Sequence, residues 1–322
     1  MTTALLSIIL LLFIAELLYF KVAAHYNIID KPNHRSSHTK ITIRGGGIIF
    51  ALAMLLYPAF FGLQYAYFLA GMFIISLISF LDDLDPISSK IRIGFHLIAV
   101  GLLFCQLDAF HLPFYFVLTA LVISIGIINA INFMDGINGI TGAYAFVTLI
   151  SLLYINGQVI EFISSSLIYT ALGAILVFNF FNFRSRARCF AGDVGSVGIA
   201  FVLIFLIAEL ILVSGNLGYL LLLVIYGLDT ISTIIFRLIR RERIFEAHRS
   251  HYYQYLANER KIPQLYVSSG YALVQLLVNA LIVYYFIKAS ILLMLFLLVS
   301  TAVFVGIRFY MEGKNRLLKA TA

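Results

Sequence analysis

Long apolar runs separated by short polar segments dominate this chain. A helix that crosses a bilayer needs about 20 apolar residues, and runs near that length recur from the first residues to residue 308. They are rich in Leu, Ile and Phe without long apolar–polar alternation, which favours helices over an outer-membrane barrel. We predict eleven spanning helices, with ten left open because several runs are short or closely joined. The predicted spans are 3–24, 45–62, 65–83, 92–107, 113–132, 142–157, 163–182, 194–214, 217–237, 267–287 and 289–308.

Composition excludes the other broad classes. Of the 322 residues 62% are hydrophobic and 11% are charged, and the mean hydropathy is +1.01. A soluble domain is about 45–50% apolar and about 25% charged, so soluble and disordered chains are both excluded. No linker and no repeat of 20–50 residues is visible, which predicts one integral membrane domain over residues 1–322. Cys105 and Cys189 are predicted at opposite membrane faces and therefore unpaired.

The basic residues predict which side each loop occupies. Residues 1–20 contain no Lys or Arg and Lys21 follows them, which favours an uncleaved first helix with the N-terminus outside. Eleven spans then place every Lys and Arg except Lys288 in cytoplasmic loops, together with the C-terminus. The net charge of +7 is therefore attributed to membrane topology rather than to nucleic acid binding. Function is expected on the cytoplasmic face, where the polar segments are long.

The first of five polar segments there ends in Arg44-Gly45-Gly46-Gly47. Glycine lets the backbone approach a ligand or another helix closely. Free N–H groups at a helix start, with Arg44 beside them, suit a phosphate, so Arg44 and Gly46 are candidate binding residues. Close helix packing explains the same pattern, and both interpretations stay open.

Two adjacent carboxylates, Asp82 and Asp83, end the apolar run 68–81. A carboxylate at membrane depth costs about 2.5–3.5 kcal/mol on insertion scales, which favours a functional role. Neighbouring helical residues point about 100° apart, so one carboxylate is expected at a metal or substrate and the other at a Lys or Arg. The alternative is an interfacial loop in which both acids pair with Lys90 and Arg92.

A third segment carries polar side chains at every third position: Asn129, Asn132, Asp135 and Asn138. On a helix they form one slowly rotating stripe, which must face protein or water because the rest of the segment is apolar. Amide and carboxylate groups suit a nucleotide, a sugar or hydrated Mg²⁺. A helix-packing seam is the alternative, but the ending in Asp135-Gly136 favours function.

The fourth segment runs from Arg184 to Ser196 and contains Asp193 in a Gly-rich turn. A lone carboxylate there suits Mg²⁺, which binds through one or two carboxylates plus substrate phosphates. The arginines at 184, 186 and 188 are better explained as ordinary positive residues of a cytoplasmic loop.

The fifth segment, residues 237–261, contains His248 and His251 on one face if it is helical. A zinc site would need more ligands, and no HExxH motif is present, so contact with phosphate or nucleotide fits better. The arginines at 237, 240, 241 and 243 fit a solvated interfacial helix as well as a substrate role.

In this order, the motifs resemble the polyprenyl-phosphate N-acetylhexosamine-1-phosphate transferases, a family that includes the phospho-MurNAc-pentapeptide translocase. The resemblance covers nearly the whole chain, and residues 247–254 look most like the branch that initiates O-antigen synthesis. It rests on Arg44-Gly-Gly-Gly47, Asp82-Asp83, Asn129-x-x-Asn132-x-x-Asp135-Gly, Phe190-x-Gly-Asp193-x-Gly-Ser196 and His248-x-x-His251.

The resemblance implies transfer of a HexNAc-1-phosphate from a UDP-sugar to undecaprenyl phosphate, with release of UMP, at the cytoplasmic side of a bacterial inner membrane. It implies Mg²⁺, for which Mn²⁺ can substitute, with Asp193 and Asp82 as ligands. Membrane lipid is an implied partner, nucleic acid is not, and a homodimer stays open. The implied catalytic residues are Asp82, Asp83, Asp135 and Asp193. The implied substrate contacts are Arg44, Gly46, Lys90, Asn129, Asn132, Asn138, Phe190, His248, Arg249 and His251.

Two departures leave details open. Asn138 stands where many bacterial members carry Asp, which affects the implied uridine contact, and the sparse pair of histidines leaves the sugar unassigned.

Three other classes of membrane protein fit less well. A secondary transporter would place carboxylates near the midplane in helices related by repeats. An intramembrane aspartyl protease needs a Tyr-Asp pair, whereas Leu228 precedes Asp229. A CDP-alcohol phosphotransferase would follow its Asp-Gly with Ala-Arg, whereas Asp135-Gly136 leads into Ile-Asn-Gly.

Overall fold

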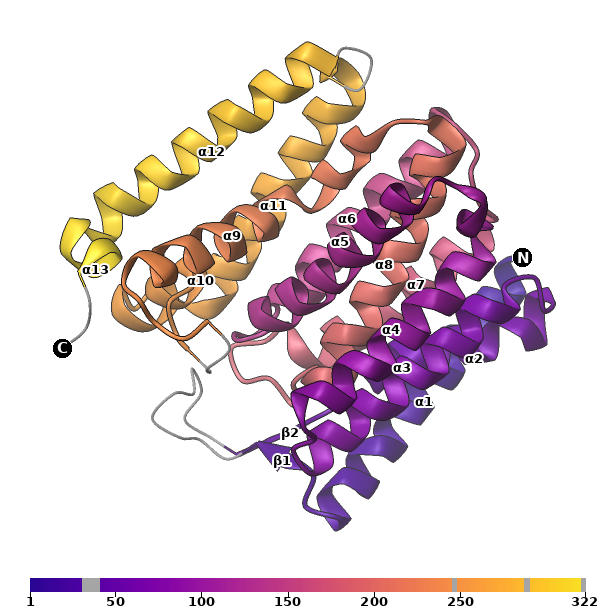
Figure 1. The fold of residues 1–322 in the computed structure, drawn as a ribbon. Helices are drawn as coiled ribbons and strands as arrows, with labels where there is room; N and C mark the ends of the chain where they lie inside the picture. Colours follow the sequence, from indigo (N-terminus) through magenta and orange to yellow (C-terminus); the bar gives the residue numbers. More distant parts are fainter. Residues whose placement is uncertain (31–40, 245–247, 287–289, 320–322) are drawn as a thin grey trace.

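The computed structural model describes residues 1–30, 41–244, 248–286 and 290–319 and shows a bundle of helices (Figure 1). Within these residues ten helical segments are long and apolar enough to cross a membrane. They confirm an all-α, multi-span architecture, and most begin and end within about three residues of the predicted bounds. The segments are α1 (Thr2–His25), α3 (Ala66–Leu84), α4 (Ser89–Gln106), α5 (Phe114–Met134), α6 (Ile140–Gln158), α7 (Ser165–Asn182), α8 (Gly192–Ser214), η2 with α9 (Leu217–Leu223 and Val224–Ile239), α11 with η4 (Gln264–Leu281 and Ile282–Phe286) and α12 (Ser290–Glu312).

The predicted span 45–62 differs from the structure. Its helix, α2 (Ile48–Phe61), has only 14 residues, fewer than the about 20 that a perpendicular span needs. The three preceding glycines form a turn instead, in which Gly45 has a φ of +79° and the Gly46 N–H donates to the Phe190 carbonyl. The eleven predicted spans are therefore ten long segments and one short helix, and the sidedness that depended on the count stays a prediction. Lys31, Arg35, Lys40 and Lys288, which entered the charge argument, lie outside the described residues.

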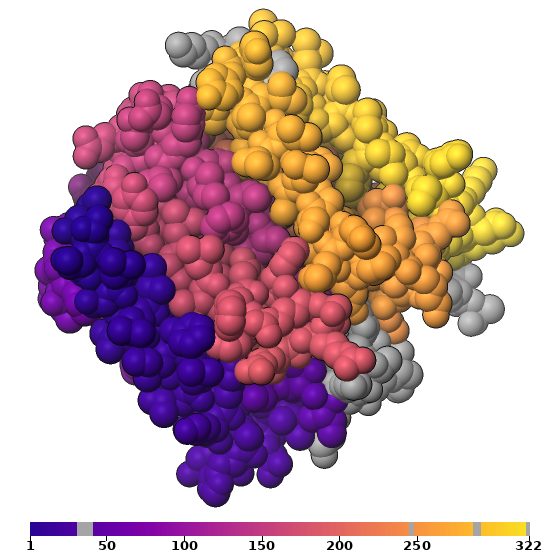
Figure 2. Space-filling view, turned by 180° about the vertical axis from the view of Figure 1, so that it is seen from behind, coloured from indigo at the N-terminus to yellow at the C-terminus, as the bar shows by residue number. Residues whose placement is uncertain are grey.

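Helix α8 forms the centre of the bundle, and α2, α3, α5 and α6 pack around it. Phe201 and Phe205 of α8 are almost fully buried and stack on Phe68 of α3. Helix α12 is the opposite case, because little of it is buried within the structure and it lies at the edge of the bundle (Figure 1). Figure 2 shows α1 and the C-terminal helices at opposite edges of the other face. Exposed leucine and isoleucine on such helices suit a lipid environment.

Short elements gather at one end of the bundle, at the lower left of Figure 1. There β1 (Ile29–Asp30) pairs antiparallel with β2 (Thr42–Ile43), with Ile29 opposite Ile43. The same end carries α10 (Tyr252–Gln254), the short η3 (Tyr255–Glu259) and α13 (Lys314–Leu318). A single turn, η1 (Ala109–His111), follows α4 at the other end. Both cysteines are free, as predicted.

Candidate functional site

Asp83 caps the start of α8 from a neighbouring helix. Its carboxylate accepts the backbone N–H groups of Asp193 and Val194 at 2.9 and 3.0 Å and pairs with Arg44 Nε at 2.6 Å. Its side chain is fully buried. Because the first N–H groups of a helix lack partners within the helix and carry partial positive charge, a buried carboxylate is stabilised there. Asp83 thereby joins three segments that are far apart in the sequence.

Asp82, one residue earlier, has a different set of partners, but it too pairs with an arginine, whereas a Lys or Arg partner was expected for only one of the two acids. It accepts the Ile87 N–H at 2.7 Å and pairs with Arg92 Nη1 at 2.5 Å. The same Arg92 nitrogen lies 3.2 Å from Asp193 Oδ2, and the Asp82 and Asp193 carboxyl groups are in hydrogen-bonding contact. Arg44 Nη2 lies 3.7 Å from the other oxygen of Asp193. Three carboxylates and two guanidinium groups therefore form one cluster, called the aspartate–arginine cluster (Arg44, Asp82, Asp83, Arg92 and Asp193).

The glycine turn packs against the start of α8 through its backbone. The Gly46 and Gly47 N–H groups donate to the carbonyls of Phe190 and Ala191, so the free N–H groups predicted here for a phosphate are already in use. A Cβ on Gly47 would lie 2.2 Å from Gly195 Cα. The packing interpretation of these glycines is therefore the one the contacts support, and their role is to hold Arg44 beside Asp83.

The polar stripe of α5 ends next to the aspartate–arginine cluster. The Ser196 hydroxyl of α8 donates to Asn132 Oδ1 at 2.9 Å, which joins the end of α5 to the start of α8. Asp135 follows the last residue of α5 and accepts a hydrogen bond from the Thr141 hydroxyl at 2.6 Å. Burial, opposed by that hydrogen bond and reinforced by the negative charge of Asp83, raises the pKa of Asp135 from 3.8 to about 6.

The two histidines lie against the same end of α5. Their Nε2 atoms are 3.2 Å apart, and their rings lie 5.8 Å (His248) and 6.3 Å (His251) from the Phe133 ring. The Tyr253 hydroxyl, from the same loop, donates to the Phe133 carbonyl. The fifth polar segment therefore lies beside the third, at the same end of the bundle.

The other predicted site residues either hydrogen-bond to the backbone or are at least partly exposed to solvent. Asn138 is buried, and its Nδ2 donates to the Arg184 carbonyl at 2.9 Å. It therefore connects the loop before α6 to the loop after α7. Asn129 Nδ2 donates to the Ile125 carbonyl of its own helix. Lys90 is exposed and Phe190 is half-buried. Roles for these residues, and for the half-buried Arg249, stay predictions.

Part of the basic cluster after α9 is buried. Arg237 and Arg240 are 3% and 8% exposed, and both pair with Glu242. A solvated interfacial helix therefore does not describe these two residues, although Arg241 and Arg243 are exposed.

The donor set of the aspartate–arginine cluster fits a hard cation. Within the described residues no three His, Cys, Asp or Glu side chains form a group that would hold a metal alone. Mg²⁺, however, binds through one or two carboxylates together with substrate phosphates and water. Two carboxyl groups in contact, as Asp82 and Asp193 are, need a proton or a cation between them, and here the Arg92 guanidinium fills that place.

Two residues of this region, Arg92 and Asp229, were not among the predicted site residues. Arg92 was considered only as a partner for the acids, yet it bridges two of them, and its buried Nε has no hydrogen-bond partner within the described residues. Asp229 of α9 is fully buried and accepts the Tyr252 and Tyr253 N–H groups. The only signal for Asp229 was a carboxylate inside an apolar run.

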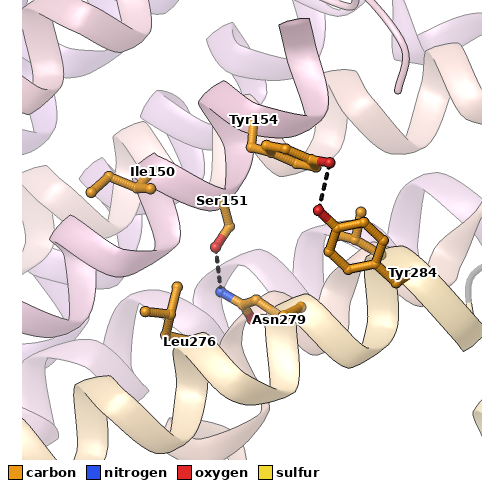
Figure 3. A pocket seen from close by; sticks show the side chains of 8 residues that line it. Ile150, Ser151, Tyr154, Leu276, Asn279 and Tyr284 are labelled. Carbon is orange, nitrogen blue, oxygen red and sulfur yellow. Dashed lines mark hydrogen bonds between the residues drawn. The ribbon is translucent and has the colours of Figure 1, made fainter. Parts of the chain in front are cut away.

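A separate groove of about 210 Å³ lies between α6 and α11 (Figure 3). Its lining is mostly apolar, with one hydrogen bond from Asn279 Nδ2 to Ser151 Oγ at 2.9 Å and another between the hydroxyls of Tyr154 and Tyr284. None of the predicted site residues lines it.

The sequence is similar to a family of glycosyl transferases. Residues 65–211, which contain all four predicted catalytic aspartates, match the model of glycosyl transferase family 4. A probable undecaprenyl-phosphate N-acetylglucosaminyl 1-phosphate transferase of Bacillus subtilis (strain 168) is 27% identical over 72% of this chain and 70% of its own length. The undecaprenyl-phosphate alpha-N-acetylglucosaminyl 1-phosphate transferase of Escherichia coli (strain K12) is 30% identical over 65% of this chain and 62% of its own length. The match thus spans about three fifths of the Escherichia coli relative.

Proposed function

Because residues 65–211 match the model of glycosyl transferase family 4 and the relatives are sugar-1-phosphate transferases, we propose that this protein transfers a HexNAc-1-phosphate from a UDP-sugar to undecaprenyl phosphate, releasing UMP. The product would be the first lipid-linked intermediate of O-antigen or a related envelope polysaccharide. The observation that carries the proposal is the aspartate–arginine cluster. It brings Arg44, Asp83 and Asp193 from three distant segments into direct contact at the end where α5 presents Asn132 and Asp135.

The two arginines supply binding sites for phosphate. Arg44 and Arg92 are each about one third exposed, so their guanidinium groups can reach a ligand without rebuilding the fold. The buried and unpartnered Arg92 Nε is a donor that a phosphate oxygen would satisfy. We assign the acceptor lipid phosphate to these two residues.

The transfer itself needs little proton chemistry from the protein. A phosphate monoester has its second pKa near about 6 and is therefore largely dianionic at neutral pH. One of its oxygens forms a bond to the β-phosphorus of the donor, the bond from that phosphorus to the bridging oxygen breaks, and UMP leaves with the electron pair. Phosphoryl transfer of this kind depends on positioning and charge neutralisation, which a cluster of fixed charges provides.

Asp193 and Asp82 would hold Mg²⁺, in keeping with the oxygen donors of the cluster. When bound, the ion supplies neutralisation of the charge that develops on the departing nucleotide phosphate. Arg92 would then turn from its bridging position to the incoming phosphate. Asp83 keeps its contacts to the α8 N–H groups and to Arg44, so it holds the cluster in place.

The donor is proposed to lie between the α5 end and the histidine loop. Asn132 and Asp135 would contact the nucleotide side, Phe190 would stack on uracil, and His248 and His251 would bind the diphosphate or sugar. The site would face the cytoplasm, since UDP-sugars are made there and the basic loops lie at this end.

The geometry disfavours an aspartyl protease. Such an enzyme uses two carboxyl groups that share a proton. Here Arg92 Nη1 lies between Asp82 and Asp193 at 2.5 and 3.2 Å, and a guanidinium cannot give up its proton at neutral pH.

A direct assay tests the proposal. Purified protein in detergent would receive undecaprenyl phosphate, Mg²⁺ and each of a panel of UDP-HexNAc donors, with UMP and the lipid product measured. We expect UMP only when lipid phosphate, divalent cation and one donor are all present. Folded protein that releases no UMP from any donor would remove the transferase proposal.

A further inference from the structure

Asp229 links the histidine loop to three helices. Its carboxylate, on α9, accepts the N–H groups of Tyr252 and Tyr253 at 2.9 and 3.2 Å and the Tyr271 hydroxyl of α11 at 2.6 Å. Arg308 of α12 lies 4.0 Å away. Burying a carboxylate completely is costly unless its oxygens are satisfied, and here the loop backbone provides that satisfaction.

His251 presents a ring nitrogen to the same carboxylate. His251 Nδ1 lies 3.4 Å from Asp229 Oδ1, and both side chains are almost fully buried. On the other side of the ring, His251 Nε2 lies 3.2 Å from His248 Nε2. His248 Nδ1 in turn lies 2.7 Å from Nη1 of the buried Arg237. A carboxylate, two imidazoles and a guanidinium therefore form one continuous chain.

The two contacts of His248, with Arg237 and with His251, are satisfied by one arrangement of ring protons. A guanidinium group only donates, so His248 Nδ1 must accept from Arg237 and the His248 proton sits on Nε2. His251 Nε2 must then accept that proton's hydrogen bond, which leaves the His251 proton on Nδ1. That atom lies 3.4 Å from Asp229 Oδ1 and has no hydrogen-bond partner within the described residues. If His248 instead carried its proton on Nδ1, that N–H would face an N–H of Arg237, and neither could accept. Arg237 and Asp229 thus lie at the two ends of this row of groups, and together they determine which ring nitrogen of each histidine carries the proton.

We propose that Asp229 is a positioning residue of the donor site: together with Arg237 it fixes the ring protons of both histidines, with His248 as the Nε2–H tautomer and His251 as the Nδ1–H tautomer. The consequence for the reaction rests on the proposed function above. The four ring nitrogens then face partners within the protein, so Asp229 and Arg237 hold the loop on the end of α5 and fix the ring faces that it presents to the donor.

Asp229→Asn is the informative variant. An amide has two N–H donors and one oxygen where the carboxylate had two acceptors, so one of the Tyr252 and Tyr253 N–H groups or His251 Nδ1–H must face a donor. We expect the KM for the UDP-sugar to rise about 100-fold, as for other displacements of about 1 Å in a site, while the KM for undecaprenyl phosphate stays at the wild-type value. A general loss of folded protein would lower kcat and leave both KM values unchanged.

Two controls bracket this variant. Asp108→Asn changes an exposed carboxylate that lies 3.6 Å from His111 at the other end of the bundle, and its kinetics should match the wild type. Tyr271→Phe removes one hydrogen bond from Asp229 without touching His251, so it should lower the melting temperature and leave both tautomers unchanged.

The tautomers can be measured without substrate. The chain has seven histidines, so ¹⁵N-histidine labelling gives a tractable spectrum in which protonated and unprotonated ring nitrogens are well separated. Wild-type protein should show the two assigned tautomers at neutral pH, and Asp229→Asn should lose the His251 Nδ1–H signal.

A wild-type His251 that carries its proton on Nε2, or on both nitrogens, overturns the proposal even if Asp229→Asn fails to fold. So does an Asp229→Asn enzyme with the wild-type donor KM. Absence of UMP release from the wild type would instead overturn the proposed function and leave the tautomer result standing.

Discussion

Replacing Gly47 by alanine tests whether backbone packing of the glycine turn positions the site. Gly47 has a φ of −70°, which any residue adopts, so a Cβ adds contact rather than backbone strain. That Cβ would lie 2.2 Å from Gly195 Cα and 2.9 Å from the Ala191 carbonyl. Ordinary contacts begin near 3.4 Å, and backbone atoms cannot rotate aside, so the turn must move from α8 by at least about 1 Å.

That displacement acts on Arg44, three residues earlier in the same turn. Its contacts of 2.6 Å to Asp83 and 3.7 Å to Asp193 would lengthen, and the cluster would lose its geometry. A misplacement of about 1 Å costs on the order of 100-fold in rate, and overpacking costs about 1–3 kcal/mol in stability. We therefore expect kcat/KM for UMP release to fall about 100-fold, with a lower melting temperature in detergent.

The matched control is Gly126→Ala on α5, where an added Cβ meets nothing within 4 Å. Both variants are assayed for UMP release at saturating Mg²⁺, and both are melted in the same detergent. Gly126→Ala should behave as wild type. If Gly47→Ala matched it in both rate and melting temperature, the packing role assigned to the glycine turn would be refuted.

Three further changes test the cluster and the α5 end. Asp193→Asn should abolish UMP release without loss of expression, and chelation of divalent cations should do the same reversibly; turnover that survives would remove Asp193 from the metal role. Arg92→Gln should raise the KM for undecaprenyl phosphate roughly 10-fold, the value of about one charged hydrogen bond, with little change in the donor KM; equal changes in both would contradict the assignment of Arg92 to the acceptor. The folded-state pKa of Asp135, about 6, lies above its ordinary 3.8 because of burial. The native state therefore binds more protons than the unfolded state across that window, so its unfolding free energy should fall as pH rises through it, while the rate should rise as the carboxylate ionises. Asp135→Asn should lose the stability slope, and an unchanged slope would show that this carboxyl is not perturbed.

The spanning helices were largely predictable, because in lipid only a helix satisfies its own backbone. The predicted segments 65–83 and 113–132 are Ala66–Leu84 and Phe114–Met134. The exception, 45–62, failed because its first residues form contacts with Gly195 and Phe190. Such contacts join residues more than a hundred positions apart, and local hydrophobicity carries no information about them.

Four of the five residues of the aspartate–arginine cluster could be singled out from the sequence, but most of their contacts could not. Adjacent positions on a helix forced Asp82 and Asp83 toward different partners, and the structure gives them Arg92 and Arg44. The bridge from Arg92 to Asp193 and the contacts of Asp229 depend on how helices pack, and the order of residues along the chain does not reveal that packing. Asn138 is the reverse case, because it was predicted as a site residue. Its side chain continues the polar stripe in sequence but donates to the Arg184 carbonyl.

The most direct test of a shared catalytic face is labelling of single cysteines from the two sides of the membrane. Exposed Cys105 would be replaced by serine, buried Cys189 would be kept, and cysteine would be placed in turn at the exposed Lys90, Arg186 and Asp108. We predict that Lys90→Cys and Arg186→Cys react only with reagent on the cytoplasmic side and Asp108→Cys only from outside. Reaction of the Lys90 and Arg186 positions from opposite sides would contradict a single site built by these segments.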